Sequence, residues 1–500
     1  MKKYVLLLLL LSGCRDYLNE ELRGDYSEES FYQNERQAVL AVNAAYQPLS
    51  FSSDNNRLWV FGDVASDDAA KGGDPGDQAD IGLVDDFQVF PNNGPVETQW
   101  AQFYEGVART NRILARIPQI PTANITPAVR DRLLGEARFL RALYYFYLVN
   151  IYGPIPVSLE PRNPDQLQIT QSPVADVYAN AIEPDLREAV RLLPVTLAGA
   201  DLGRATKGAA NALLARASLY QGKWQQAFDA AQAVISSGQY DLLPLYAQNF
   251  QITGRNSRES VFSVQHLTGQ VPFQGNRLNQ WFAPRSGENG YFFDAPTTAF
   301  VNEFEKNTAG VVDPRLDYTV GRQGGRWVNG EAFDPSWSPT GYLNKKHVQP
   351  LAEVPVSLKG DGNLNYVLIR YADVLLMAAE ALNELNRPAE AIPLVNRVRK
   401  RARESYLNDP TLRPTTGTAA VPTGLLPDLG SISQGNLREA IRHERRVELG
   451  FEFHRWFDLM RYGKDYAQNA LRDKPNFNYD RNRYFPIPQS ERDTNKALKF

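Results

Sequence analysis

The chain has 500 residues, and 54 Lys and Arg side chains against 57 Asp and Glu give it a formal net charge of −3. This near balance gives no support for nucleic-acid binding or for a solvating acidic tail. Hydrophobic residues make up 43% and charged residues 22%, which excludes wholesale disorder. A mean hydropathy of −0.42 and the lack of an apolar run of about 18 residues exclude a polytopic membrane protein. Length alone suggests about three domains.

The only cysteine, Cys14, follows a segment typical of export signals. Lys2 and Lys3 precede an apolar stretch, Tyr4–Leu11, that is too short to span a bilayer. Small residues then lead into Cys14, and this segment resembles the lipobox of bacterial lipoproteins. We therefore expect residues 1–13 to be a signal peptide and Cys14 to carry lipid. An ordinary signal peptide with a chance cysteine is the alternative.

Three helices are predicted in the first third of the chain. Apolar residues at near-helical spacing indicate a helix within residues 20–50. Residues 51–95 are rich in Gly, Asp and Asn, which favours loop with short extended pieces. A second helix is predicted over 97–117. The third covers 130–152, where apolar side chains recur every three or four residues until a Gly-Pro pair ends the run.

Two later segments look like one helical hairpin repeated. In the first, a helix ends before Gly222 and another begins at Trp224; in the second, a helix ends before Asn386 and another begins at Pro388. Aligning the two turns also pairs Leu214 with Ala378, Ala227 with Ala391 and Val234 with Val398. The pattern resembles the tetratricopeptide helix–turn–helix. Two unrelated hairpins are the alternative.

Lone units of this kind cannot bury their apolar faces, so we expect helices at 97–152 and 176–193 to stack with them. Between the hairpins, residues 240–365 are rich in Asn, Gly, Pro and aromatics and contain one strand-like run at 260–265. Residues 405–436 are rich in Pro, Thr and Gly and predict an insertion loop on the surface.

The last predicted helix covers 437–462. Opposite charges stand three residues apart in it five times, at Glu439–Arg442, Arg445–Glu448, Glu452–Arg455, Arg455–Asp458 and Asp458–Arg461. This spacing favours a helix stabilised by its own ion pairs; a charged catalytic face is the alternative. Together the elements predict one mainly α domain over residues 14–500, in which tetratricopeptide-like hairpins form a right-handed α-superhelix with long loop-rich insertions and minor β structure.

Catalytic and metal-binding motifs are missing from the sequence. The four histidines form no HExxH pattern, and neither a Gly-x-Ser-x-Gly elbow nor a Walker loop occurs. His443 and His454 lie eleven apart on the last predicted helix, hence on one face, but among Arg and Glu. Residues 360–365 begin like a calcium loop but lack its later Gly and Glu, which favours a turn. We therefore expect no metal and no cofactor, and these residues leave an enzyme unsupported but not excluded.

An acidic stretch at residues 63–86 holds eight aspartates against one lysine, Lys71. Three interpretations stay open: a solvated loop, a loop whose carboxylates hydrogen-bond to a ligand, and a calcium site. Asp68 is the candidate ligand contact in this stretch.

Large aromatic side chains also gather in loop-like sequence. Trp100, Trp224 and Trp456 lie on predicted helices and are expected in the core, whereas Trp59, Trp281, Trp327 and Trp337 lie outside them, near Tyr291. A ring offers a flat apolar face to an otherwise wet ligand such as a sugar. Packing of these rings back onto the core is the alternative. The candidate contacts are Trp281, Tyr291, Trp327 and Trp337.

Five sequence blocks follow one another along the chain. They are Cys14–Leu18; Glu136–Ala142 with Tyr144–Phe146 and Tyr152–Pro156; Arg370–Met377 with Ala379–Ala381; Glu444–Leu449 with Phe451, Glu452 and His454–Leu459; and Phe485–Pro488 with Glu491 and Asn495. Together they resemble the SusD/RagB family of outer-membrane nutrient-binding lipoproteins. The resemblance is weak in residues 240–340 and 405–436, where members of that family diverge.

The resemblance implies a cell-surface lipoprotein, anchored in the outer membrane through Cys14, that captures a glycan or oligosaccharide. It also implies hand-over of the ligand to a SusC-like TonB-dependent transporter, and no catalytic residues. The five blocks are structural in the family, so the candidate contacts depend on loop position and chemistry alone, within about residues 51–95 and 240–365. A peptide ligand, as in the RagB branch, is the alternative, and a surface glycosidase is a remote one.

Overall fold

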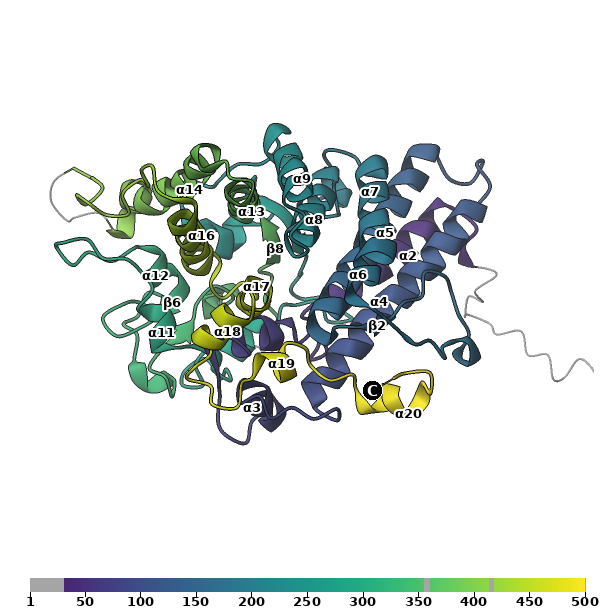
Figure 1. Ribbon diagram of the computed structural model, residues 1–500, viewed down its shortest axis with the longest axis horizontal. Coiled ribbons are helices and arrows are strands. Elements are labelled where there is room, and N and C mark those ends of the chain that lie inside the picture. Colours follow the sequence, from purple (N-terminus) through teal and green to yellow (C-terminus); the bar gives the residue numbers. More distant parts are fainter. Residues whose placement is uncertain (1–30, 355–359, 413–417, 500) are drawn as a thin grey trace, which may run out of the picture.

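The computed structural model describes residues 31–354, 360–412 and 418–499 (Figure 1). The predicted signal peptide and Cys14 lie outside these residues. The longer helices are α2 (Glu35–Tyr46), α4 (Gly94–Arg116), α5 (Pro127–Tyr152), α7 (Glu183–Leu192), α8 (Lys207–Leu219), α9 (Trp224–Ser236), α13 (Tyr371–Glu384), α14 (Pro388–Arg403) and α16 (Gln434–Leu449). In the described ranges, no helix combines the length and the apolar character needed to cross a membrane.

Shorter elements connect these helices. The short α-helices are α3 (Ala79–Asp85), α6 (Val174–Val177), α10 (Leu278–Phe282), α11 (Thr298–Val301), α12 (Arg315–Thr319), α15 (Ser405–Asn408), α17 (Arg455–Tyr462), α18 (Lys464–Ala470), α19 (Tyr479–Asn482) and α20 (Gln489–Thr494). π-Helical turns are η2 (Val60–Val64) and η5 (Tyr178–Ile182). 3₁₀ turns are η1 (Gln47–Leu49), η3 (Ile117–Gln119), η4 (Pro164–Gln166), η6 (Gly199–Asp201), η7 (Tyr246–Phe250), η8 (Ile252–Gly254), η9 (Pro335–Trp337), η10 (Leu351–Glu353) and η11 (Pro410–Leu412).

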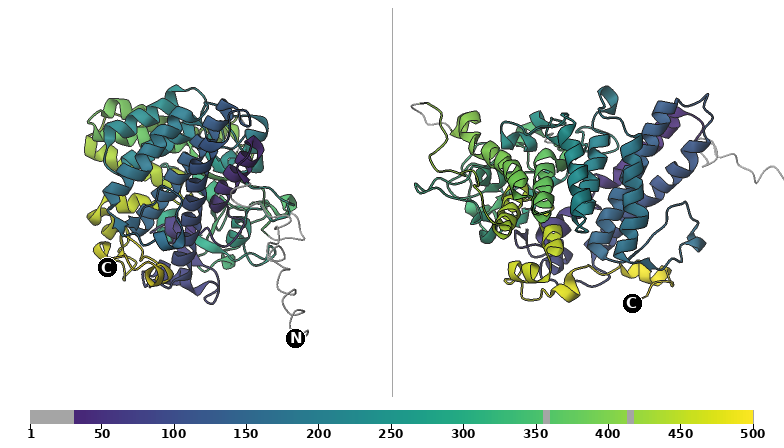
Figure 2. Two further views of the ribbon diagram at one scale, coloured as in Figure 1. Left: turned by 90° about the vertical axis from the view of Figure 1, so that its right-hand side faces the viewer. Right: turned by 45° about the horizontal axis from the view of Figure 1, so that its top comes forward.

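The longer helices pack side by side in chain order (Figures 1 and 2). Helix α5 packs on α4 and α7, α8 on α7 and α9, and α13 on α9, α14 and α16. The helices predicted at 97–117 and 130–152 are α4 and α5, and Gly153, at a φ of 78°, ends α5 as the sequence predicted. The mainly α class with minor β structure is confirmed.

The two hairpins α8–α9 and α13–α14 share the predicted turn geometry. Gly222 and Asn386 both adopt the left-handed conformation, with φ of 67° and 60°, and the second helices begin at Trp224 and Pro388. Left-handed backbone suits Gly and is tolerated by Asn, which explains why these two residue types mark the turns. The aligned positions Leu214, Ala378, Ala227, Ala391, Val234 and Val398 are all buried. The repeat is therefore confirmed.

Within the described residues, four two-stranded antiparallel ribbons connect segments between the longer helices. The strands are β1 (Ala69–Gly72) with β5 (Phe293–Pro296), β2 (Ile155–Pro156) with β3 (Gln171–Ser172), β4 (Ser260–Val264) with β8 (Tyr366–Arg370), and β6 (Val320–Gly321) with β7 (Leu343–Asn344). Strand β4 confirms the run predicted at 260–265. The ribbon β1–β5 joins the two regions that the sequence marked as candidate ligand-binding regions.

The insertion predicted as a surface loop at 405–436 is only partly exposed. It carries α15 and η11, and its Leu425 and Leu426 are buried against Ala402 of α14. Two apolar leucines thus fasten the segment to the helical array.

The prediction of one helix over 437–462 is wrong. The chain forms α16 and α17, and between them Phe451 and Phe453 adopt left-handed backbone with φ of 63° and 66°. The break receives the backbone of η2: a Cβ on Gly62 would lie 2.4 Å from the carbonyl oxygen of Phe453. Close contact between two distant segments therefore overrides the helical periodicity of this sequence.

The predicted ion pairs within that helix are also largely wrong. Glu439–Arg442 at 3.0 Å and Asp458–Arg461 at 2.8 Å form. The other charged side chains face partners from distant segments. For example, Arg445 pairs with Asp373 at 2.8 Å and Arg455 with Asp67 at 2.7 Å.

A buried ion network occupies the junction of β8, α14 and α16. Arg370 contacts Glu448 at 2.5 Å, Glu452 at 2.7 Å and Glu259 at 3.0 Å. Burial alone raises the pKa of the Glu448 carboxyl, but Arg401, Arg370 and Arg315 outweigh it and hold the pKa below its ordinary value. The charges that the sequence predicted to pair on a helix surface are therefore partly buried in this network. Removing one of them leaves its partners uncompensated, which is costly.

Candidate functional site

The ribbon β1–β5 brings two distant loops to one place. Ala70 faces Ala295 and Gly72 faces Phe293, and the Gly73 N–H donates to the Phe292 carbonyl at 3.0 Å. Residues 73–78 leave β1 at the end of the ribbon where residues 283–292 enter β5. Because the strands run antiparallel, both loops project from this one end.

The two loop tips are held together by Arg285. Its guanidinium pairs with Asp74 at 3.0 Å and with Asp77, and it lies 5.8 Å from the centre of the Tyr291 ring. The Tyr291 ring stacks on Phe293 with centroids 5.6 Å apart, and the residue is 37% exposed. An aromatic face therefore stands at the surface with charged hydrogen-bonding groups beside it.

Arg57 lies beneath this surface and is the most unusual charge in the site. It is only 7% exposed, and its guanidinium lies 5.5 Å from the centre of the Trp281 ring. The Arg57 Nη2 donates to Gln78 Oε1 at 3.2 Å, whereas Nε is buried and has no hydrogen-bond partner. Among the residues that the structure describes, no carboxylate pairs with Arg57, and burial lowers its pKa. Buried arginines normally have such a partner, so this one keeps unused donor capacity.

A pocket of about 250 Å³ opens beside Arg57. Its other lining residues are Gln78, Ala79, Asp80, Gly94, Pro95 and Thr98. The Asp80 carboxylate accepts from the Gly94 N–H at 2.9 Å at the start of α4. The pocket therefore offers both a donor, Arg57, and acceptors, Asp80 and Gln78, next to the aromatic rings.

A second aromatic cluster supports the loop 283–292 from its other side. The Trp327 indole N–H donates to Glu288 Oε1 at 2.7 Å, and its ring packs against Phe333 and half-buried Trp337. Trp327 itself is 2% exposed. Burial raises the pKa of the Glu288 carboxyl to about 7. This cluster fixes the loop that carries Arg285 and Tyr291.

The structure thus separates the five candidate contacts. Tyr291 is at the surface of the site, and Trp281, 5% exposed, lies under Arg57 against the buried Trp59 ring at 5.9 Å. Trp327 and Trp337 belong to the supporting cluster.

Asp68 lies away from the site. It is 1% exposed and pairs with Arg446 at 2.7 Å, and burial raises its pKa to about 6. A cavity of about 720 Å³ lies beside this pair, and it is lined by Asp67, Arg446 and Arg455 among others.

The remaining aspartates of residues 63–86 are mostly neutralised by neighbours, as Asp85 is by Lys474. In the described parts of the chain, no group of three or more His, Asp or Glu side chains has the geometry to hold a metal ion. His443 and His454 do not share a helix face, since the chain breaks between them.

Asp63 and Asp294 form a buried acidic pair below the ribbon. Asp63 Oδ1 and Asp294 Oδ1 are buried without hydrogen-bond partners, while Asp294 Oδ2 accepts from Asn344 at 2.9 Å. Burial raises the pKa of both carboxyls, and each of the neighbouring charges Asp294 and Asp68 raises that of Asp63 further. The neutral acid is therefore the form that the fold accommodates.

We expect Asp294→Asn to become stabilising as the pH rises. A raised pKa gives wild type a stability contribution that is full below the ordinary carboxyl value near 4 and is lost as the pH rises through the folded-state pKa. Asn cannot ionise and keeps an acceptor for Asn344, so the variant should gain about 1–3 kcal/mol relative to wild type between pH 4 and pH 8. Urea denaturation at each pH measures this difference. The exposed Asp131→Asn is the control, and a difference that does not change with pH contradicts the expectation.

Sequence reasoning missed Arg57. One signal was present: this arginine directly precedes the apolar run Leu58–Phe61, so a charge is drawn into the core with it. Only the structure reveals that no carboxylate of the described residues pairs with Arg57.

Models of known protein families match both parts of the chain that build the site. A model described as starch-binding associating with outer membrane matches residues 24–219, and the model of the SusD family matches residues 258–499. A solved structure, a laminarin-binding SusD-like protein, is 30% identical, with 94% of this chain and 99% of that chain covered and a TM-score of 0.75. This chain belongs to the SusD/RagB family.

Other SusD-like proteins are similar over nearly their whole length. SusD-like protein P2 of Formosa agariphila is 29% identical, with 100% of this chain and 99% of that protein covered. A SusD superfamily protein of Bacteroides vulgatus is 25% identical, with 94% and 99% covered and a TM-score of 0.78. The SusD/RagB membership predicted from the five sequence blocks and the mainly α, tetratricopeptide-like fold predicted from the two hairpins are confirmed.

Proposed function

We propose that this SusD-family protein binds a glycan at the surface formed by Arg57, Gln78, Asp80, Arg285 and Tyr291. The observation that carries the proposal is Arg57, a buried guanidinium that lines a pocket and forms no ion pair with a carboxylate of the described residues. Its free donor capacity and the Asp80 carboxylate suit sugar hydroxyls, and the Tyr291 ring suits the apolar face of a sugar. The similarity to a laminarin-binding protein supports the same ligand class.

Trp281, Trp327 and Trp337 act behind this surface in the proposal. The Trp281 ring holds the Arg57 guanidinium, and Trp327 holds Glu288 in the loop that carries Arg285 and Tyr291. Asp68 contributes to stability through Arg446 and not to ligand contact.

The same proposal includes the anchor and the partner. Acyl chains on Cys14 would hold the protein in the outer membrane with the site at the cell surface, since several chains on one residue anchor stably. A SusC-like TonB-dependent transporter would receive the captured oligosaccharide. The protein would bind and not cleave its ligand.

Affinity electrophoresis in gels that contain laminarin or other polysaccharides tests the proposal. We expect retardation of wild type, and about tenfold weaker binding for Tyr291→Ala and for Arg57→Gln, because each loses a ligand contact. Tyr291→Ala should keep its melting temperature because the ring is exposed. Leu40→Ala, which removes an exposed apolar side chain of α2 outside both candidate regions, is the control.

Three outcomes contradict this function. Unchanged affinity in both site variants would show that the glycan does not bind at this surface. Release of reducing ends by wild type would indicate a glycosidase, and binding of peptides instead of polysaccharides would favour the RagB-type alternative.

A further inference from the structure

Helix α4 presents a stripe of side chains to a second pocket, which shares no lining residue with the pocket beside Arg57. Trp100, Tyr104, Val107, Ala108 and Arg112 follow one another at steps of three, four and one, so they share a helix face. The Trp100 and Tyr104 rings lie 4.6 Å apart, centre to centre. This face is one wall of a cavity of about 420 Å³.

The other walls come from residues 156–169 and from α20. Pro156, Pro161, Leu167 and Ile169 make this side mainly apolar, and α20 contributes Glu491 to the lining. The walls are fastened to each other, because the Asn495 amide donates to the Ile169 carbonyl at 2.9 Å. The Lys496 N–H likewise donates to Gln168 Oε1 at 2.7 Å. The cavity is therefore preformed, as small-molecule pockets usually are.

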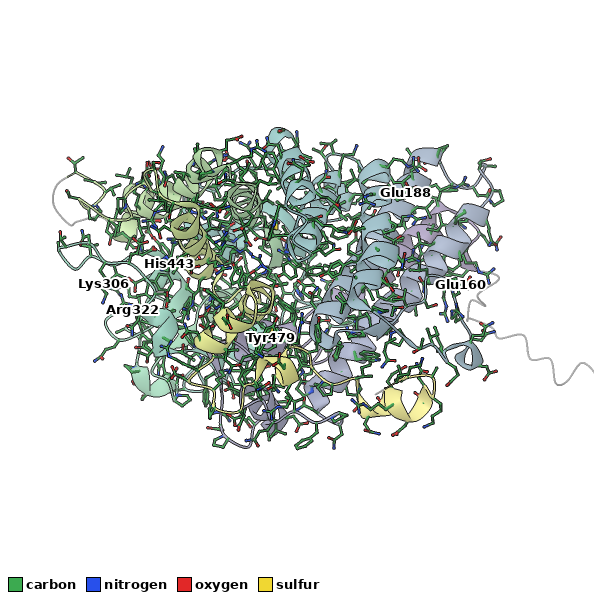
Figure 3. All side chains as sticks on the ribbon, in the orientation of Figure 1. Glu160, Glu188, Lys306, Arg322, His443 and Tyr479 are labelled. Carbon is green, nitrogen blue, oxygen red and sulfur yellow. The ribbon has the colours of Figure 1, made fainter. Side chains whose placement is uncertain are left out.

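Two opposite charges on the lining lack ionic partners. The Arg112 side chain makes no hydrogen bond or ion pair with any residue that the structure describes, and the Glu491 carboxylate accepts only from the Asn495 amide at 3.0 Å. By contrast, Arg162 and Glu160, which also line the pocket, pair with each other at 3.2 Å. Figure 3 shows Glu160 near the end of the molecule that carries α4 and α5.

An apolar cavity with one free cation and one free anion suits a ligand that is apolar and zwitterionic. Apolar walls favour an aliphatic or aromatic side chain. A free carboxylate can pair with Arg112 in two parallel hydrogen bonds, and an ammonium group can pair with Glu491. A neutral sugar could hydrogen-bond to both groups but would neutralise neither charge.

We propose that this pocket is a second ligand site that binds an apolar amino acid, either free or as a short peptide. The ligand carboxylate pairs with Arg112, its ammonium group with Glu491, and its side chain lies between Tyr104 and Leu167. The site is independent of glycan binding, because it shares no residue with the surface around Arg57 and Tyr291.

Isothermal titration calorimetry with three probes tests this site: L-phenylalanine, phenylalanyl-phenylalanine, and N-acetyl-L-phenylalanine amide. We expect one of the two zwitterions to bind at least about tenfold more tightly than the neutral amide. Whichever of L-phenylalanine and phenylalanyl-phenylalanine binds more tightly shows whether the ligand is a free amino acid or a peptide. Arg112→Gln and Glu491→Gln should each lower the affinity for the zwitterionic probe by about tenfold.

Matched controls come from α7, where Glu188 and Arg191 pair with each other at 2.7 Å on the exposed surface. Glu188→Gln and Arg191→Gln should leave the affinity within about twofold of wild type.

Ala108→Phe should abolish binding without a change in melting temperature, because its exposed side chain would fill the cavity. Absence of binding up to about 20 mM, or equal binding of the neutral amide, overturns the proposal. Glycan retardation of Arg112→Gln should equal that of wild type, so failure here is distinguishable from failure of glycan binding.

Discussion

Replacement of Arg370 by Met is expected to destabilise the fold by about 3–5 kcal/mol. Arg370 is 1% exposed and contacts the carboxylates of Glu448, Glu452 and Glu259. Removing the guanidinium leaves these buried carboxylates with less compensation, and the cost of a buried unpaired charge exceeds the gain from the apolar Met side chain. Urea denaturation at pH 7 measures the loss.

Arg387→Met is the matched control for this prediction. Arg387 pairs with Glu390 at 2.7 Å on the surface, where such pairs contribute little. Adding Glu448→Gln to Arg370→Met should recover part of the lost stability, since one uncompensated carboxylate disappears. Equal stability of Arg370→Met and Arg387→Met would show that the buried network does not stabilise the fold.

Acid should unfold the protein through the same network. Burial raises the pKa of the Glu452 carboxyl, but Arg370 and Lys346 outweigh it and bring the pKa to about 2. For Asp458, Arg445 and Arg461 do the same, again to about 2. A lowered pKa contributes stability that is complete above the ordinary value near 4 and is lost as the pH falls through the folded-state value. Each of these carboxyls should therefore account for about 3 kcal/mol between pH 5 and pH 2.

Urea midpoints measured from pH 7 down to pH 2 test this dependence. The raised pKa values of Asp63 and Asp294 act in the opposite sense and reduce the net loss. Arg370→Met should show a shallower decline than wild type, because Glu452 then titrates nearer its ordinary value, whereas Arg387→Met should follow wild type. A wild-type midpoint that stays constant from pH 5 to pH 2 would contradict the expectation.

The helical array could be predicted because its signals are local. Apolar spacing located α4 and α5, and the Gly222 and Asn386 turns located the two hairpins to within a residue. Gly and Asn mark left-handed turns whatever the rest of the chain does. The helix predicted over 437–462 was wrong because a contact with a distant segment, which has no local signal, interrupts it. Its periodicity continues through residues 450–454, and only the contact of Gly62 with Phe453 explains the break.

The site could be predicted by region but not by residue. Residues 51–95 and 240–365 do meet in one ribbon, and Tyr291 stands at its surface. Trp327 and Asp68 were predicted as ligand contacts on the same grounds as Tyr291, although both side chains are buried. An aromatic ring or a carboxylate in a loop looks alike in sequence whether it faces solvent or the core. Arg57 was missed because its distinguishing property, burial without an ion pair to any described carboxylate, leaves no pattern in the sequence.

The ribbon β1–β5 also has a consequence for how the protein folds. Ala70 pairs with Ala295, so a stretch of more than two hundred residues must be synthesised and brought back before the two loops can meet. Closing so long a loop has an entropic cost that local helical hairpins do not bear. The hairpins should therefore assemble early and the glycan surface late. Competence to bind would then appear only when nearly the whole chain has folded, so ligand capture itself reports complete maturation.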